Sequence, residues 1–273
     1  MKTILHLSIA GFIIKLVFHK SLDKQNKVTP KQFLKEILKY NKGFILEKKP
    51  PSTDFIIEFL EAKGFDIYEN NEKRGFIHFY SPVAYHHIST FYHISRVQFI
   101  YILKSAVEEL LSRKGCVIHC SASLVRNHAV VFFGKSGAGK TTISSMLQKE
   151  YPVLADDEGY IKREGKTFYF YQGPFLERSY SFAKTSTRYP IAAAYILEQG
   201  KNCTISKPTK DEISKISLQF TSTQELSVVN KSLFSMKNNI PVQKLVFTKK
   251  KEELMNCIFN HAPFNDATGL DTK

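Results

Sequence analysis

The sequence lacks the features that mark secreted and membrane proteins. It has only four cysteines, and they show no paired framework, so a reducing compartment suits them. His6 and Lys15 interrupt the apolar opening segment, which leaves no run long enough to span a bilayer, and no signal-peptide cleavage site follows. We therefore expect two short strands around Gly11 and a cytoplasmic protein without a membrane anchor.

Acidic residues and arginine are also scarce. Lys and Arg together number 39 against 25 Asp and Glu, which gives a formal net charge of +14, and only seven of the 39 are arginines. The lysines are dispersed, without a basic helix or a series of stacking aromatic residues, so we expect no nucleic-acid partner. An acidic peptide as a substrate would suit the positive charge as well as a nucleic acid would. The sequence does not decide whether the protein forms a homo-oligomer.

The chain is long enough for one large or two modest domains, because 273 residues with 43% hydrophobic content can bury a sizeable core. Residues 1–94 show a mixed α+β pattern without recognisable chemistry. A second domain is predicted over residues 95–261, and its first part, residues 95–113, reads as an amphipathic connecting helix. The polar residues 262–273 are predicted to be a disordered tail.

The most informative segment is a complete match to the phosphate-binding loop pattern G-x-x-x-x-G-K-S/T. It comprises Gly134, Lys135, Ser136, Gly137, Ala138, Gly139, Lys140 and Thr141, with Thr142 next in the chain. The glycines let the backbone curl with its N–H groups toward phosphate oxygens. Lys140 can reach the β and γ oxygens, and Thr141 can hold Mg²⁺ through its hydroxyl. The loop therefore predicts a bound nucleoside triphosphate.

The segments around the loop agree with this interpretation. Residues 128–133 read as a buried strand that enters the loop, and residues 141–148 as an amphipathic helix whose positive N-terminal end faces the anion. Upstream, residues 116–125 alternate like a strand, and Arg126-Asn127 makes a two-residue turn into the strand of the loop. We therefore expect an α/β fold, in which flanking helices cover a nucleotide-binding sheet.

Two carboxylates follow the next predicted strand. The apolar residues 153–155 lead directly into Asp156 and Asp157. In open α/β sheets, ligands bind beyond the carboxyl ends of the strands, so both side chains should project toward the metal and the γ-phosphate. We assign Asp156 as the general base and Asp157 as a metal ligand.

Motifs of competing classes are missing from the sequence. No N-K-x-D guanine motif accompanies the D-x-x-G of residues 156–159, which disfavours a regulatory GTPase, and the L-S-G-G-Q segment of transporter ATPases does not occur. A zinc site is disfavoured too, because Cys116 and Cys120 share one strand face while His119 points to the other, and no second ligand pair follows.

The sequence resembles the C-terminal catalytic domain of the HPr kinase/phosphorylase family in the order and spacing of three features. These are His119, the loop from Gly134 to Thr142 and residues 154–157. The resemblance covers about residues 115–248. The family's glycine-rich segment after the catalytic strand is not recognisable, which indicates a smaller relative rather than HPr kinase itself. The resemblance implies a fold like that of HPr kinase and phosphoenolpyruvate carboxykinase, in which His119 assists Asp156 and Lys140 neutralises charge.

The resemblance further implies the transfer of the γ-phosphate of ATP, with Mg²⁺, to a serine-type hydroxyl of a peptide, a protein or a small molecule. ATP and GTP both fit the loop. Two other interpretations stay open. One is a regulatory module that hydrolyses ATP slowly and acts through partner binding, and the other is a protein similar to the phosphoenolpyruvate carboxykinases, whose metal and substrate motifs are not visible here.

A later segment adds two candidate residues. Residues 172–188 are polar and aromatic, which predicts a loop over the substrate. Within it, Glu177 is a candidate metal ligand and Arg178 a candidate phosphate ligand, with a role as surface charges as the alternative.

Overall fold

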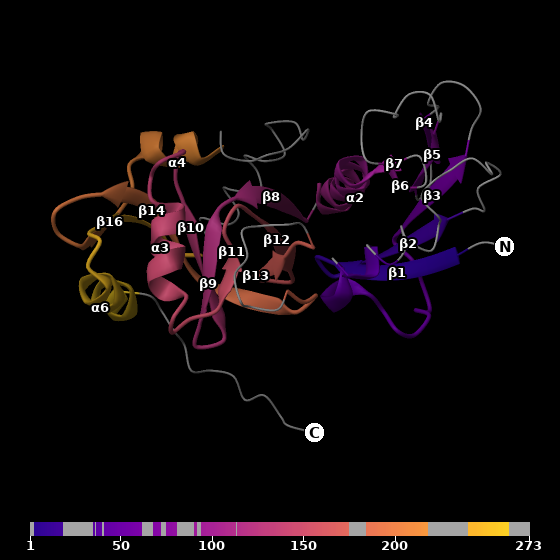
Figure 1. Ribbon diagram of the computed structural model, residues 1–273. Helices are drawn as coiled ribbons and strands as arrows, with labels where there is room; N and C mark the ends of the chain where they lie inside the picture. Colours follow the sequence, from indigo (N-terminus) through magenta and orange to yellow (C-terminus); the bar gives the residue numbers. More distant parts are fainter. Residues whose placement is uncertain are drawn as a thin grey trace. The chain divides into compact units, whose positions relative to one another are not determined.

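The computed structural model describes residues 3–18, 35, 37–39, 41–61, 68–71, 75–80, 90–91, 94–112, 114–174, 184–217 and 240–261 (Figure 1). The chain divides into two compact units by its internal contacts. The first unit comprises Met1–Arg113, Gly173–Leu176 and Ala183–Ser186, and the second comprises Lys114–Gln172, Glu177–Phe182 and Thr187–Lys273.

The first unit contains a sheet in which five strands are described, in the order β1-β2-β3-β5-β4. These strands are β1 (Thr3–Ile9), β2 (Phe12–Phe18), β3 (Phe55–Glu61), β4 (Tyr68–Asn71) and β5 (Gly75–Tyr80). Ala10 and Gly11 join β1 to β2 as a two-residue turn with positive φ angles of 51° and 70°, the conformation that matches the twist of a hairpin. The predicted strands around Gly11 are confirmed.

The remaining elements of the first unit are η1 (Lys42–Phe44), β6 (Thr90–Phe91), β7 (Ile94–Ser95) and α2 (Arg96–Leu111). One face of α2 is buried through Phe99, Ile102, Leu103, Ala106, Val107 and Leu111. This spacing confirms the amphipathic helix expected over residues 95–113. The contacts count α2 with the first unit, whereas the sequence assigned it to the second domain. The predicted domain boundaries stay a prediction, and the predicted tail 262–273 lies outside the described residues.

Within the described residues of the second unit, nine strands form one sheet. Seven follow the order β11-β9-β10-β14-β13-β12-β8, while β16 pairs with β14 and with β15. The strands are β8 (Gly115–His119), β9 (Ser121–Val125), β10 (His128–Phe133), β11 (Val153–Ala155), β12 (Glu158–Glu164), β13 (Thr167–Gln172), β14 (Arg188–Gln199), β15 (Thr204–Ser206) and β16 (Val242–Phe247). The described helices are α3 (Lys140–Leu147), α4 (Lys210–Ser217) and α6 (Lys251–His261).

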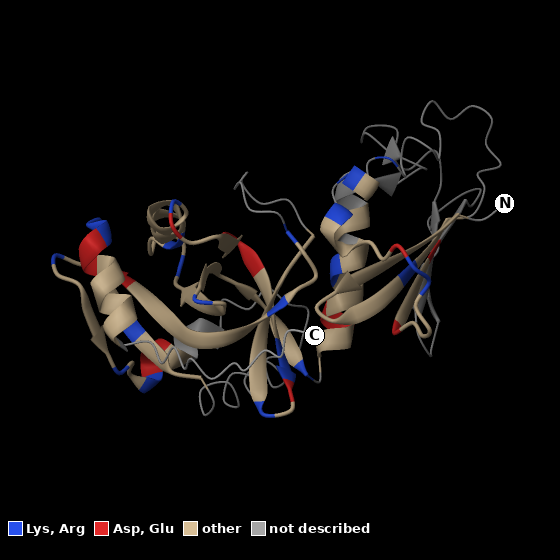
Figure 2. Ribbon diagram, turned by 90° about the horizontal axis from the view of Figure 1, so that it is seen from below, with Lys and Arg blue, Asp and Glu red and all other residues tan. Residues whose placement is uncertain are grey.

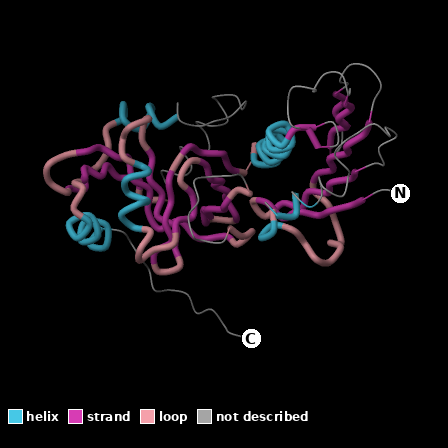
Figure 3. The backbone as a smooth tube through the Cα atoms, in the orientation of Figure 1, coloured by secondary structure: helices cyan, strands magenta, loops and turns pink. Residues whose placement is uncertain are grey.

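The protein is therefore a mixed α/β protein with one large sheet and few helices among its described residues, as the sequence predicted (Figure 3). The sheet itself is mixed, because β10 pairs with β14 and β14 with β16 in parallel, while the other described pairings of this unit are antiparallel. Strand β9 lies between β10 and β11 and is antiparallel to both. Strands β10, β11, β14 and β16 thus run in one direction and end at the same edge.

The sheet curls because β8 and β9 form one bent segment, β11 and β12 form another, and these two segments pair with each other. Residues 115–125 are interrupted only at Cys120, and they run antiparallel to residues 153–164, which are interrupted at Asp156 and Asp157. The backbone N–H of Cys120 donates to the carbonyl of Asp157 at 3.1 Å and bridges the two interruptions. Since β8 and β11 are the ends of the strand order, this pairing brings the two ends of the sheet together.

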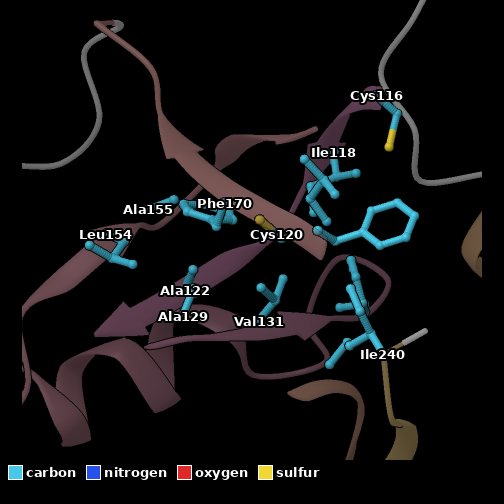
Figure 4. Close-up of a cluster of buried hydrophobic side chains, with 14 residues drawn as sticks. Cys116, Ile118, Cys120, Ala122, Ala129, Val131, Leu154, Ala155, Phe170 and Ile240 are labelled. Atoms are coloured by element: carbon cyan, nitrogen blue, oxygen red, sulfur yellow. The ribbon is translucent and has the colours of Figure 1, made fainter. Parts of the chain in front are cut away.

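The curl encloses one of two hydrophobic cores that the described residues of the second unit form. Ile118, Ala122, Val131, Leu154 and Phe170 belong to this cluster and come from five different strands (Figure 4). The second core lies on the other face and includes Phe132, Ile143, Leu147, Tyr195 and Leu254, which bury α3 and α6 against the sheet. The turn at Arg126 and Asn127, with positive φ angles of 47° and 62°, closes the β9–β10 hairpin as predicted.

Charge is spread over both units. Figure 2 shows Lys and Arg on several separate elements, with Asp and Glu interspersed. Among the described residues, none of the helices is long and apolar enough to cross a membrane.

A capping box begins helix α4. The backbone N–H of Thr209 donates to Glu212 Oε2 at 2.8 Å, and the backbone N–H of Glu212 donates to Thr209 Oγ1 at 3.2 Å, which satisfies two N–H groups at the start of the helix. Lys244 Nζ lies 2.8 Å from Glu212 Oε1 and ties the helix to β16. Hydrogen bonds from Lys244 and from the backbone of Thr209 lower the pKa of Glu212 to about 2.

We expect Glu212→Gln to lower the free energy of unfolding by an amount that depends on pH. Because the pKa of Glu212 is lower in the folded state, its carboxylate stabilises the fold fully above the unfolded pKa of about 4.3 and loses this effect as pH falls toward about 2. Urea unfolding of wild type and variant should differ most at neutral pH and converge in acid. Glu198→Gln, which removes the more exposed partner of Lys244, is the control and should show a smaller difference. A difference that does not change with pH would contradict the ion pair as its cause.

Candidate functional site

The phosphate loop follows β10 directly and leads into α3, as the sequence predicted. Gly137 and Gly139 have positive φ angles of 81° and 107°, which L residues rarely adopt. The N–H of Ala138 donates to the carbonyl of Lys135 at 3.0 Å and tightens the loop. Thr141 and Thr142 are half-buried in the first turn of α3. The loop therefore has the curled backbone that phosphate oxygens require.

Lys140 lies inside this curl. Its side chain is buried, and Nζ donates to the carbonyls of Gly134 at 2.6 Å and Lys135 at 3.4 Å. Burial lowers the pKa of Lys140, and the nearby carboxylates of Asp157 and Asp156 counteract this in part. The ammonium group is thus held by the loop's own carbonyls and lies in the field of both aspartates.

Neighbouring strands fix the loop from outside. Gln199 ends β14 and donates its side-chain amide to the carbonyl of Gly137 at 2.9 Å. The hydroxyl of Ser121, at the start of β9, donates to the carbonyl of Lys140 at 3.3 Å. Neither residue was predicted from the sequence as part of the site. Their only signal in the sequence was that both are polar residues at the ends of strands. A contact between Gln199 and Gly137, which are 62 residues apart in the chain, cannot be predicted from a local sequence pattern.

The two aspartates follow β11 at the same edge of the sheet as the loop. Strand β9 lies between β11 and β10, the strand that leads into the loop. That both carboxylates project toward a bound metal and phosphate stays a prediction. Asp156 is buried, with 7% of its surface exposed, while 71% of the Asp157 side chain is exposed. The two neighbouring carboxylates therefore have very different environments, and only Asp157 is open to a solvent-borne molecule.

His119 lies against Asp157. Its Nδ1 is 2.9 Å from Asp157 Oδ1, and a third of the imidazole surface is exposed. The resemblance implied that His119 assists Asp156, whereas in the structure His119 contacts the other aspartate, Asp157. The physical reason is the bent pairing of the strands, which places the end of β8 opposite the start of β12, directly after Asp157.

The oxygen donors at this edge suit magnesium. A threonine hydroxyl and carboxylates are hard ligands, and Mg²⁺ is usually held by one or two such groups together with substrate phosphates. Thr141, Asp156 and Asp157 offer this donor set. A cluster of three or more His, Cys, Asp or Glu side chains that could hold a metal ion by themselves is not found among the described residues. Glu177, the third predicted metal ligand, and Arg178 lie outside the described residues.

Comparisons with known proteins found similarity to a family model and to solved structures. A family model described as phosphoenolpyruvate carboxykinase matches residues 102–188, which include the phosphate loop and both aspartates but make up less than half of the chain. Among solved structures, the HPr(Ser) kinase/phosphatase from Coxiella burnetii is similar with 14% sequence identity and a TM-score of 0.33, over 53% of this chain and 95% of that chain. None of the curated proteins matches.

The phosphate loop, the aspartates beside it and the family match together indicate a kinase-like, nucleotide-binding protein. The match extends from within α2 to the first residue of β14, so it includes His119 as well. It assigns the chain to no single family.

Proposed function

We propose that the second unit is a P-loop phosphotransferase that moves the γ-phosphate of ATP to a serine-type hydroxyl of a peptide, a protein or a small molecule. The observation that carries this proposal is the arrangement at one edge of the sheet. A buried loop lysine, Lys140, lies in the field of two aspartates, and the exposed one of these contacts His119. Phosphoryl transfer depends mainly on positioning and charge neutralisation, and this edge offers groups for both.

On the nucleotide side, the loop from Gly134 to Thr142 supplies the binding groups. Its backbone N–H groups and the N-terminus of α3 attract the phosphates, and Lys140 neutralises the charge that develops between the β and γ groups. In the structure Lys140 Nζ bonds to two loop carbonyls. A phosphate in the loop would offer this ammonium group a stronger, charged acceptor.

On the acceptor side, we propose that Asp157 is the base and that His119 orients it. The solvent exposure of the two aspartates supports this assignment of roles. A base must reach the hydroxyl of an incoming acceptor, and Asp157 is exposed whereas Asp156 is buried. Asp156 and Thr141 then hold Mg²⁺, which neutralises phosphate charge when bound. This reverses the roles that the sequence suggested for the two aspartates. Glu177 stays a predicted further metal ligand.

The proposed reaction is a direct displacement. The acceptor oxygen forms a bond to the γ-phosphorus, while the bond between that phosphorus and the oxygen bridging to the β-phosphate breaks. The hydroxyl proton passes to the Asp157 carboxylate, and ADP leaves with the electron pair of the broken bond. His119, at 2.9 Å from the carboxylate, stabilises the orientation in which Asp157 accepts the proton.

The family match favours a second candidate, a carboxykinase-type transfer between a nucleotide and phosphoenolpyruvate. Both candidates use the same loop and metal, and they differ in the acceptor. A test must therefore contain both acceptor classes.

We expect purified protein with γ-labelled ATP and Mg²⁺ to label one member of a panel of free serine, serine-containing peptides and HPr. Asp157→Asn should lower transfer by about 10²–10⁴-fold while ATP affinity stays unchanged, because it removes only the proton acceptor. Asp156→Asn should instead raise the Mg²⁺ concentration needed for half-maximal rate. Lys140→Ala, which removes the phosphate contact, should weaken ATP binding and abolish transfer.

Each alternative has its own outcome in this experiment. If Asp156→Asn loses transfer with normal metal dependence and Asp157→Asn does not, the sequence-based assignment of the roles is right. ATP formation from ADP, phosphoenolpyruvate and bicarbonate would support the carboxykinase. Slow phosphate release with every acceptor unlabelled would favour a regulatory ATPase over the kinase.

The glycines of the loop allow a matched test of nucleotide binding. A Cβ at Gly139 would lie 2.4 Å from Phe247 Cζ, a buried ring beneath the loop, whereas a Cβ at Gly137 meets nothing within 4 Å. Both residues have positive φ, so both alanine variants carry backbone strain, on the order of 1–2 kcal/mol. Only Gly139→Ala also pushes the loop away from its support.

We therefore expect Gly139→Ala to weaken ATP binding by at least about tenfold more than Gly137→Ala, as measured by titration calorimetry. Gly139→Ala combined with Phe247→Leu, which removes the clashing ring atoms, should recover part of the loss. Equal effects of the two single variants would mean that the support from β16 does not shape the nucleotide site.

A further inference from the structure

Strand β11 carries a bulge immediately before the two aspartates. Val153 pairs with Ser123 and Ala155 pairs with Ala122, so three residues of β11 stand opposite two residues of β9. Leu154 is the additional residue. A bulge of this kind bends its strand and re-aims the side chains that follow, which here are Asp156 and Asp157.

The carbonyl of the bulged residue accepts a hydrogen bond from Gln172. This residue ends β13 and is 1% exposed, and its Nε2 donates to the carbonyl oxygen of Leu154 at 3.1 Å. Strands β11 and β13 are not neighbours in the strand order, so the bond crosses the inside of the curled sheet. A buried side-chain amide needs a hydrogen-bond acceptor for its N–H group, because water cannot supply one.

We infer that Gln172 is a positioning residue of the phosphotransferase site, which holds the β11 bulge and thereby the direction of both aspartates. The inference rests on the proposed function. Three steps carry it. The bulge leaves the Leu154 carbonyl out of the regular ladder, Gln172 supplies a donor to that carbonyl, and the next two residues of β11 carry the carboxylates. Gln172 contacts neither nucleotide nor acceptor in this scheme and acts through the backbone of β11.

The type of side chain at this position matters. Methionine has nearly the same length and shape as glutamine but offers no donor, and buried apolar surroundings accept it readily. With Gln172→Met, the Leu154 carbonyl stays buried without its side-chain donor, so the bulge is free to adopt other geometries. Displacements of a catalytic group by about 1 Å can cost 10²-fold in rate.

The first test compares Gln172→Met with wild type in the transfer assay. We expect kcat to fall by about tenfold to a hundredfold, while the affinity for ATP without metal stays within about twofold, because the phosphate loop is built on other strands. Hydrogen exchange at the amides of residues 153–157 should become faster in the variant. Asn41→Leu is the matched control, since Asn41 is also buried and donates its amide to a backbone carbonyl, that of Ile37, at 2.9 Å. It should lower Tm yet leave the exchange of residues 153–157 unchanged.

A second variant uses pH as a readout. In Gln172→Glu the side chain can donate to the Leu154 carbonyl only when its carboxyl group is protonated, and the ionised form would repel that oxygen. The rate of this variant relative to wild type should therefore rise as pH is lowered. The same ratio for Gln172→Met should not change with pH, because methionine has no titratable group.

The outcomes separate this inference from the proposed function. If wild type transfers phosphate and Gln172→Met has the same kcat, or if exchange at residues 153–157 is unchanged, the positioning role is wrong. If no acceptor is labelled by wild type but exchange at these residues accelerates in Gln172→Met, the proposed reaction is wrong while Gln172 still holds the bulge.

Discussion

The candidate site depends on one interruption in the pairing of two bent strands. In a regular ladder, successive side chains point to opposite faces of the sheet and every residue has a partner on the neighbouring strand. Here the ladder is interrupted at Cys120 on one strand and at Asp156 and Asp157 on the other, and one backbone hydrogen bond spans the gap. The interruption buries the first carboxylate near Lys140 and exposes the second beside His119.

The charge of Lys140 gives this arrangement its energetic reason. A buried ammonium group loses its hydration, and the loss lowers its pKa unless nearby groups favour the charged form. Two loop carbonyls and the field of the aspartates supply part of that compensation, and the pKa stays lowered. The same groups keep the lysine inside the loop, where an incoming phosphate finds a positive charge already in place. Loop and carboxylates are therefore coupled electrostatically as well as through the sheet.

Features encoded by short segments could be predicted from the sequence. The phosphate loop, the turn at Arg126-Asn127 and the buried face of α2 follow from local spacing, and the structure has all three. Contacts between distant segments could not be predicted in this way. The partner of His119 depends on the register between β8 and β12, and the bulge at Leu154 depends on β9, so neither is visible in the residues concerned. Periodicity predicted one strand over residues 116–125, because Cys120 carries no local signal of the interruption.

The two sides of the site are held by different parts of the sheet. Gln199 of β14 and Phe247 of β16 support the phosphate loop, whereas Gln172 of β13 holds the strand that carries the carboxylates. Each tie joins a side chain to a backbone segment far away in sequence. Because the ties share no residue, loosening one should leave the other in place. Nucleotide binding and phosphoryl transfer are then separable by single substitutions, although the groups that serve them meet at one edge of a single sheet.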